Sequence, residues 1–333
     1  MKMKDLHVVA LGNALVDVEY QISNEELEQT GLRKGGMTLA SADEQQALLQ
    51  TLADKKGYMS SGGSAANSII AFGQFGGRGA YKSVLGNDEL GHFYANEFSE
   101  LGLELFADKN SDHPTGTCVV LITPDAERTM QTSLGVNSLF DKHQLVEDSI
   151  KRAEWLYVEG YKFTDDKGAE AIEEAIFYAK KYDTKVAVTF SDTFIVMGFR
   201  DVLNKAAAEA DLIFANEFEA KAYAETENMD EAFAMLASNM PNVAITLGDK
   251  GAKIKVGSSI VEIPSYPTTV INTNGAGDMF AGGFLYGITH GLTPEKAGKL
   301  ASYASSKVVA QHGARLRASH IDVRNDIVAG VVN

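Results

Sequence analysis

The chain has 333 residues, of which 45% are hydrophobic and 23% are charged, and its net charge at pH 7 is −15. This length suits one large domain, and the composition is typical of a soluble globular protein. The strongly acidic balance argues against a nucleic-acid-binding surface, so any bound phosphate must rely on local hydrogen-bond donors.

A single cysteine, Cys118, excludes an internal disulfide and a cysteine metal cluster, and it favours a reducing compartment. The N-terminal apolar run is broken by Asn13 and Asp17, which is typical of a first strand and not of a signal peptide. No apolar run approaches the length of a membrane span. We therefore expect a cytoplasmic protein without membrane or nucleic-acid partners.

The first half of the chain mixes buried and half-exposed elements. Residues 6–12 are continuously apolar, as in a strand covered on both faces, whereas residues 18–22 and 37–40 alternate between apolar and polar. Two Thr- and Val-rich segments, 115–123 and 127–134, predict a hairpin. Further patterns predict helices over residues 43–52, 64–75 and 88–101 and a strand over 80–85.

The second half alternates regularly between strands and helices. Strands are predicted at 155–159, 185–190, 212–215 and 243–247, and helices at 166–182, 193–208, 217–224, 276–290 and 294–312. This rhythm predicts an α/β fold with a doubly wound, mostly parallel sheet flanked by helices. No linker interrupts it, so we expect one domain over residues 1–333. The half-exposed pieces at about 17–40 and 114–137 are predicted to form a small antiparallel β lid over the carboxyl ends of the sheet.

One turn near the C-terminus suggests phosphate chemistry. The run from Asn272 to Asp278 leads from an extended segment through Gly275, Ala276 and Gly277 into a helix. Backbone N–H groups and the positive helix end there suit an anion, and Asp278 beside them suits a proton acceptor in phosphoryl transfer. Taken alone, the run is more typical of a tight turn with a capping Asp than of an anion site.

Two earlier stretches carry residues that suit a polar ligand. Asp17 follows the first strand and can accept two hydrogen bonds from a vicinal diol, although a solvated loop acid is the simpler explanation. Gly62, Gly63 and Asn67 form a helix start made of small residues with an amide one turn in. Such a start admits a ligand, or serves close packing of the helix on a strand.

Three further groups suit a nucleotide and its metal. Asn216 and Glu219 begin a helix, where they form an ordinary capping pair or hold hydrated Mg²⁺. Thr246, Gly248 and Gly251 make a two-glycine turn that admits a nucleotide or closes a hairpin. Arg128 on the predicted lid is placed to clamp a phosphoryl oxygen, unless it only solvates the surface.

Common nucleotide-binding signatures are missing from the sequence. The first strand is followed by the single glycine Gly12, so there is no dinucleotide fingerprint, and no P-loop run occurs. The seven histidines show no metal-ligand spacing. These absences exclude a nicotinamide-dependent dehydrogenase and a P-loop protein.

Taken together and in order, these stretches resemble the ribokinase (PfkB) family of carbohydrate and nucleoside kinases. Within it the chain is most similar to adenosine kinases, through residues 12–17, the Pro114–Cys118 hairpin start, Arg128 with the following strand, and residues 272–278. The resemblance implies a ribokinase-like fold, ATP and Mg²⁺ as cofactors, and a small nucleoside or sugar as substrate. It is compatible with a monomer or with a dimer paired through its lids.

The resemblance also implies a role for each matching residue. Asp278 would be the catalytic base, with Gly275, Ala276 and Gly277 as anion hole and Arg128 as clamp. Glu219 would serve the metal. The substrate-binding set would be Asn13, Leu15, Asp17, Gly62, Gly63, Asn67, Leu134 and Asn137, and the ATP-binding set Asn216, Thr246, Gly248 and Gly251.

Two positions depart from the family's pattern. Asn272 stands where the family usually has an Asp associated with a monovalent-cation site, and Lys162 stands where adenosine kinases tend to be aromatic. We predict an ATP-dependent kinase that phosphorylates a ribose-type primary hydroxyl, most simply the 5′-hydroxyl of adenosine or a related nucleoside. A sugar kinase of the same family is the first alternative, favoured by the charge of Lys162. A non-catalytic nucleoside or sugar sensor is the second.

Overall fold

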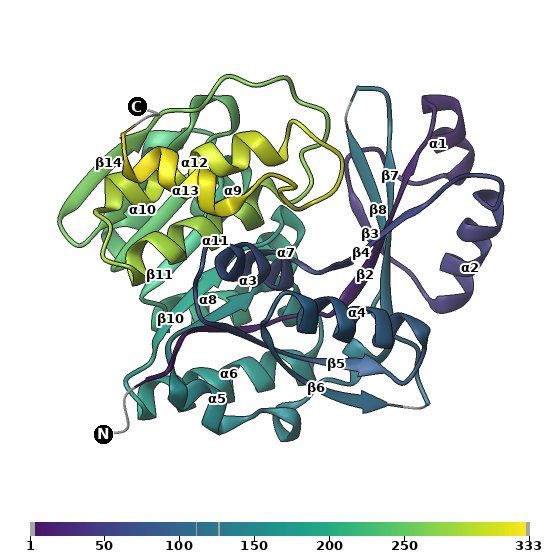
Figure 1. Ribbon diagram of the computed structural model, residues 1–333, viewed down its shortest axis with the longest axis horizontal. Coiled ribbons are helices and arrows are strands. Elements are labelled where there is room, and N and C mark those ends of the chain that lie inside the picture. The colour runs from purple at the N-terminus through teal and green to yellow at the C-terminus, as the bar shows by residue number, and fades with distance from the viewer. Residues whose placement is uncertain (1–3, 111, 126, 331–333) are drawn as a thin grey trace.

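The computed structural model describes residues 4–110, 112–125 and 127–330, which form two β-sheets and their covering helices (Figure 1). The larger sheet has nine strands in the order β14-β13-β12-β11-β10-β9-β1-β5-β6. All neighbours from β12 to β6 pair in parallel, and β13 and β14 extend the sheet as an antiparallel hairpin. The bounds are β1 Leu6–Leu11, β5 Gly79–Gly86, β6 Glu104–Asn110, β9 Ala153–Glu159, β10 Lys185–Thr189, β11 Leu212–Asn216, β12 Asn242–Thr246, β13 Ala252–Val256 and β14 Ser259–Ile263.

Helices cover both faces of this sheet, because its central strands are apolar on both sides. Along β1, Val8 and Ala10 belong to one buried cluster, and Val9 and Leu11 belong to the other. The first cluster includes residues of α3 (Ser64–Gln74), α4 (Glu89–Glu100), α11 (Ala276–Thr289), α12 (Pro294–Val308) and α13 (His320–Val328). The second includes residues of α5 (Glu147–Arg152), α6 (Asp166–Lys181), α7 (Thr193–Gly198), α8 (Arg200–Glu209), α9 (Glu217–Ala224) and α10 (Met229–Asn239).

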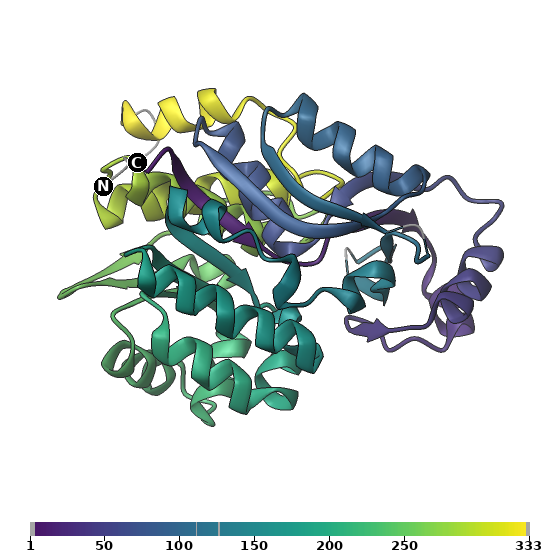
Figure 2. The ribbon, with the colours of Figure 1, turned by 90° about the horizontal axis from the view of Figure 1, so that it is seen from below.

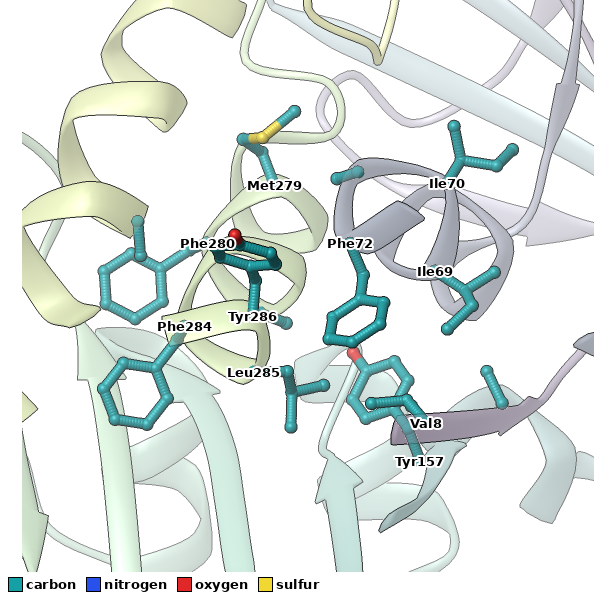
Figure 3. Close-up of a cluster of buried hydrophobic side chains, with 14 of the residues drawn as sticks. Val8, Ile69, Ile70, Phe72, Tyr157, Met279, Phe280, Phe284, Leu285 and Tyr286 are labelled. Atoms are coloured by element: carbon teal, nitrogen blue, oxygen red, sulfur yellow. The ribbon is translucent and has the colours of Figure 1, made fainter. Parts of the chain in front are cut away.

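Helices α3 and α11 pack side by side in the first cluster, and this contact positions the site. Figure 3 shows Phe72 of α3 facing Leu285 and Tyr286 of α11, with Tyr157 of β9 beneath them. The helices approach closely because Gly282 faces α3: a Cβ there would lie 2.4 Å from the carbonyl oxygen of Ser68. This buried packing therefore fixes the N-termini of α3 and α11 relative to each other.

The smaller sheet has five strands in the order β3-β8-β7-β2-β4. Helices α1 (Asn24–Thr30) and α2 (Ala42–Thr51) cover one face, through a cluster that includes Leu27, Leu48 and Val119. Figure 2 shows both helices, in purple, at the end of the molecule opposite the two termini. The strands are β2 Leu15–Gln21, β3 Met37–Leu39, β4 Tyr58–Gly62, β7 Gly116–Ile122 and β8 Arg128–Ser133.

The predicted α/β class and the mostly parallel sheet are confirmed, but several elements differ from the prediction. Strand pairs β2–β7 and β3–β8 are parallel, so the expectation of a wholly antiparallel small sheet is wrong. The helix predicted over 193–208 is divided at Phe199 into α7 and α8. Strands β4, β6 and β14 were missed; all three are half-exposed edge strands, and the sequences of β4 and β6 carry no continuous apolar pattern. Strand β13 and helices α1, α5 and α13 were missed as well.

The order of the strands locates the ligand side of the large sheet. From β1 the chain continues to β5 and β6 on one side, and later to β9, β10, β11 and β12 on the other. Ligands of such sheets bind beyond the carboxyl ends of the strands, at the point where the order reverses. Here that point lies between the ends of β1 and β9, and the smaller sheet begins directly beyond it at Leu15.

Candidate active site

A cavity of about 560 Å³ lies between the carboxyl ends of the large sheet and the uncovered face of the smaller sheet. This is the size range of small-molecule and cofactor sites. Leu15, Cys118 and Met130 of the smaller sheet contribute an apolar wall. The predicted site residues that line it are Asn13, Leu15, Asp17, Gly63, Asn67, Arg128, Leu134, Asn216, Glu219, Thr246, Gly248, Gly275, Ala276, Gly277 and Asp278.

Three predicted residues, Gly62, Asn137 and Gly251, lie behind the cavity wall. A Cβ on Gly62 would lie 2.2 Å from Cγ of Asp17, so this glycine makes room for that carboxylate. Asn137 accepts hydrogen bonds from the N–H of Ala14 and from Ser83 Oγ, both at 3.0 Å. Gly251 has a φ of +90° in the turn before β13. These residues shape the site from behind.

The turn that the sequence predicts as an anion site forms the start of α11. Gly275 is the N-cap residue with a φ of +75°, and a Cβ there would lie 2.2 Å from the carbonyl oxygen of Ala314. Ser305 Oγ donates to the carbonyl of Ala276 at 2.9 Å, which holds the turn from the other side. Gly277 differs, because no heavy atom of the described residues lies within 4 Å of the Cβ that it lacks. Gly275 is thus required by the fold, whereas Gly277 leaves open space beside the unsatisfied N–H groups of the first helical turn.

Asp278 follows Gly277 in the first turn of α11, where it is half-buried and lines the cavity. Ser64 Oγ donates to its Oδ1 at 2.6 Å, and Asn67 Nδ2 donates to its Oδ2 at 3.0 Å. Burial raises the pKa of Asp278, while these two hydrogen bonds and the nearby charge of Arg128 oppose the rise. The carboxylate is therefore oriented by α3 and keeps partners that favour its charged form.

Ser64 is a site residue that the sequence interpretation missed, since only its capping potential was considered. The N-cap of α3 is Gly63, and Ser64 is directed at a carboxylate 214 residues away in the chain. A hydroxyl in a helix start made of small residues was the available signal. Its partner depends on the packing of α3 against α11, which the sequence does not display.

Asp17 also lines the cavity, from β2 of the smaller sheet. Its side chain is buried and has no hydrogen-bond partner among residues 4–110, 112–125 and 127–330. Burial and the neighbouring carboxylate of Glu19 raise the pKa of Asp17 to about 7. A buried carboxylate facing a cavity without partners is suited to hydroxyl groups that arrive with a ligand.

Glu159 is a second residue that the sequence interpretation missed. It ends β9 at the switch point, where its Oε1 accepts from the N–H of Asn13 and its Oε2 from the N–H of Ala65, both at 2.7 Å. Burial raises its pKa to about 7, against the effect of those hydrogen bonds. A Cβ on Gly12 would lie 2.5 Å from Glu159 Oε2, which explains the glycine after β1. Glu159 therefore joins the end of β1 to the start of α3.

The loop before the anion-binding turn is held by the smaller sheet. Asn274 donates through Nδ2 to Glu19 Oε1 at 3.3 Å and accepts through Oδ1 from Arg128 Nη1 at 2.5 Å. Asn272 Oδ1 accepts from the N–H of Asn274 at 2.8 Å, and its Nδ2 lies 3.4 Å from Glu19 Oε1. A carboxylate is thus present beside position 272, supplied by Glu19 of β2.

Asn216 and Glu219, which the sequence predicts to serve ATP and its metal, line the cavity and form a reciprocal capping box at the start of α9. Asn216 donates to Glu219 through its N–H at 2.9 Å and its Nδ2 at 2.6 Å. Burial raises the pKa of Glu219 to about 7. In the described part of the chain no three His, Cys, Asp or Glu side chains gather as a metal site. One carboxylate on a cavity wall still fits hydrated Mg²⁺, which takes few protein ligands.

The buried position of Lys162 contradicts the argument that its charge favours a sugar substrate. Its side chain is 1% exposed in the 3₁₀ turn η3 (Gly160–Thr164), and it does not line the cavity. Its Nζ lies 3.1 Å from Asn13 Oδ1 and 3.3 Å from the carbonyl oxygen of Asn137. An ammonium in this position cannot meet the charge of a substrate directly.

Comparison with known proteins identifies the class to which this fold and site belong. Residues 38–321 match the pfkB family of carbohydrate kinases, and the chain belongs to this family. It is therefore a phosphotransferase that acts on a hydroxyl group, as the sequence predicted.

Individual relatives extend over nearly the whole chain. Adenosine kinase of Saccharomyces cerevisiae is 29% identical, over 85% of this chain and 89% of its own. The structure of adenosine kinase from Sinorhizobium meliloti is 31% identical with a TM-score of 0.91, covering 96% of this chain and 99% of that one. That of a probable sugar kinase from Rhizobium etli is 29% identical with a TM-score of 0.93, covering 99% and 100%.

Proposed function

We propose that this protein transfers the γ-phosphoryl group of ATP to a primary hydroxyl of a nucleoside, with the 5′-hydroxyl of adenosine as the acceptor. The observation that carries the proposal is the placement of Asp278 at the open helix start of α11, on the same cavity as the carboxylate of Asp17, which has no hydrogen-bond partner among the described residues. Similarity to adenosine kinases over most of the chain supports the choice of acceptor.

The acceptor end of the cavity is suited to a ribose. Asp17 offers two carboxylate oxygens to a vicinal diol. Leu15 and Leu134 offer an apolar surface to a flat base. Polar groups that hold the sugar and an apolar rest are the usual composition of such a pocket.

The chemical step uses Asp278 as the base and the helix start as the anion hole. The acceptor hydroxyl takes the place of the Ser64 hydroxyl at Asp278, its oxygen bonds to the γ-phosphorus, and its proton passes to the carboxylate. The bond from the γ-phosphorus to its bridging oxygen breaks, leaving ADP. A weak base suffices because the transition state is loose, and the N–H groups of the first turn stabilise the charge on the equatorial oxygens.

The donor end belongs to Asn216, Thr246 and Gly248, with Glu219 as the residue that would hold the waters of a magnesium ion. Mg²⁺, when bound, neutralises charge on the phosphate oxygens. Arg128 lies at the boundary between the two ends, where its guanidinium is within reach of transferred oxygens. Its present hydrogen bond to Asn274 would be exchanged for a phosphoryl oxygen.

We further propose that the whole chain is one kinase domain, in which the smaller sheet acts as a lid that excludes water from the cavity. Among the described residues no helix is long and apolar enough to cross a membrane. A cytoplasmic location follows from the composition and the single cysteine. The protein acts as a monomer or as a dimer paired through its lids.

The test is an ADP-release assay with the full-length protein, ATP and Mg²⁺ over a panel of nucleosides and free sugars, with Asp278→Asn as the background control. Turnover of adenosine above all sugars supports the proposal. Turnover of sugars alone assigns the protein to the sugar kinases, which the similarity to the Rhizobium etli protein makes the second candidate. Binding without turnover indicates a sensor.

A further inference from the structure

The buried ammonium of Lys162 touches the acceptor side of the cavity from behind. Its Nζ donates to Asn13 Oδ1 at 3.1 Å and to the carbonyl oxygen of Asn137 at 3.3 Å. It also lies 4.5 Å from the ring centre of Phe140, in the geometry of a cation–π contact. Asn13 itself lines the cavity, so Lys162 is separated from any ligand by one side chain.

This contact determines which end of the Asn13 carboxamide faces the ligand. An amide can present either its oxygen or its NH₂ group, and a rotation of 180° exchanges them. An ammonium has donors only, so it can bind the oxygen and not the NH₂ group. With Oδ1 held by Lys162, Nδ2 is the free end, and it has no hydrogen-bond partner among residues 4–110, 112–125 and 127–330.

The backbone at Asn13 is held just as firmly. Its N–H donates to Glu159 Oε1 at 2.7 Å, and the next N–H, that of Ala14, donates to Asn137 Oδ1 at 3.0 Å. Neither the main chain nor the side chain of Asn13 can therefore rotate freely to suit a ligand. The group is preorganised as a donor.

Burial of a lysine at position 162 carries an unfavourable desolvation free energy. Burial disfavours the ammonium and lowers the pKa of Lys162 to about 8, although Asp165 and Glu159 oppose the shift. An unbranched apolar side chain would fill the space beside Phe140 without that desolvation penalty. Packing and stability thus give no reason for the charge.

We propose that Lys162 is a positioning residue that makes Asn13 an obligatory hydrogen-bond donor to the acceptor substrate. The enzyme then selects substrates with a lone pair at this point, such as a nucleoside whose base presents an unprotonated ring nitrogen. It discriminates against those that present an N–H group there, because two donors would face each other. This inference rests on the proposed function for the identity of the substrate, and on the described contacts for the role of Lys162.

The experiment is a double-mutant cycle with Lys162→Met and Asn13→Ala, singly and together, in the full-length protein. The measured quantities are kcat and the KM values for the acceptor and for ATP. Lys162→Met should raise the acceptor KM about tenfold, the effect of one weakened hydrogen bond, with kcat and the KM for ATP changed less than about threefold. In the Asn13→Ala background the same substitution should raise the acceptor KM no further, because the amide it orients is gone.

Two further variants separate positioning from folding. Lys82→Met removes another buried ammonium, 2% exposed and paired with Asp108 at 2.7 Å, that does not line the cavity. It should change the melting temperature and leave the acceptor KM unchanged. Asn13→Asp retains a partner for Lys162 but cannot donate when ionised, so it should raise the acceptor KM at least as much as Lys162→Met. If Lys162→Met does not fold, an acceptor KM of Asn13→Asp equal to that of wild type still overturns the inference, because position 13 would then need no donor.

Equal acceptor KM values for Lys162→Met and wild type, or fully additive effects of the two substitutions, would overturn the inference. Failure of the proposed function is recognised separately, because wild type would then phosphorylate only sugars or nothing. In the first case the cycle is run with the sugar, and in the second with dissociation constants for adenosine from calorimetry. The coupling between positions 13 and 162 decides the inference in each case.

Discussion

The carboxylate of Asp17 should reduce the stability of the empty enzyme, and Asp17→Asn should therefore stabilise the fold while it removes acceptor binding. Asp17 is buried without a hydrogen-bond partner in the described part of the chain, and Glu19 adds a second negative charge beside it. The neutral amide of Asn has nearly the same shape, so the substitution changes charge with little change in packing.

The magnitude follows from the pKa. The difference between the usual pKa of 3.8 and a pKa of about 7 corresponds to roughly 4 kcal/mol of lost unfolding free energy above pH 7. The Asn amide also lacks partners, so we expect a net gain of about 1–3 kcal/mol. For a chain of 333 residues, about 2 kcal/mol raises Tm by about 3 °C.

The sign of the pH dependence gives a sharper test than the size of the effect. Folded protein keeps the proton of Asp17 up to about pH 7, whereas the unfolded chain loses it near pH 4. The stability lost in wild type therefore grows as the pH rises from 4 to 7 and is nearly complete above 7. The Tm difference between Asp17→Asn and wild type should be larger at pH 8 than at pH 5.

The assays are thermal unfolding at these two pH values, followed by steady-state kinetics. The acceptor KM should rise by about 10- to 100-fold in Asp17→Asn, because charge-assisted hydrogen bonds to a diol are lost, while the KM for ATP stays near wild type. A variant that is less stable than wild type at both pH values, or an unchanged acceptor KM, would refute the reasoning.

Three other substitutions test the donor side and the base. Gly277→Ala should fold with an equal or higher Tm, because its Cβ meets no heavy atom within 4 Å, yet kcat/KM for ATP should fall at least about tenfold; unchanged kinetics would remove Gly277 from the anion hole. Asp278→Asn should lower kcat by roughly two to four orders of magnitude, with ATP binding retained by calorimetry, and near-normal turnover would exclude Asp278 as the base. Glu219→Gln should raise the Mg²⁺ concentration for half-maximal activity about tenfold. Because the pKa of Glu219 is about 7, wild type should need more Mg²⁺ as the pH falls below 7 and the variant should not; parallel titrations would contradict the metal role.

The parts of the fold that could be predicted are those whose pattern is local. The strand at Leu6–Leu11 is apolar at every position because both faces are covered, and glycine runs such as the one before Asp278 mark turns wherever they occur. Strand β6 carries no such signal. It lies at the edge of the sheet and is half exposed, so polar side chains are compatible with it.

The residues of the site also divide into those that a local motif predicts and those that no local pattern marks. Asp17 and Asp278 were predicted because each stands in a motif, and the structure places both on one cavity. Ser64 and Glu159 were not, because their partners come from elements far apart in the chain: 214 residues separate Ser64 from Asp278, and 146 separate Asn13 from Glu159. Which strand ends meet is decided by topology, and no local spacing records it. The role of Lys162 was misinterpreted, because a sequence shows that a residue is charged but not where its side chain points.

The contacts of Ser305 and Ala314 with the turn at the start of α11 bear on when a growing chain can first catalyse phosphoryl transfer during synthesis. Ser64 and Asn67 emerge from the ribosome more than two hundred residues before their partner Asp278. The turn before Asp278 is contacted by Ser305 and Ala314, which are synthesised later still. A nascent chain therefore contains most of the residues of its acceptor pocket long before it contains Asp278 and the turn that α11 begins. Phosphoryl transfer starts only when nearly the whole polypeptide has been made, so partly synthesised chains cannot consume ATP.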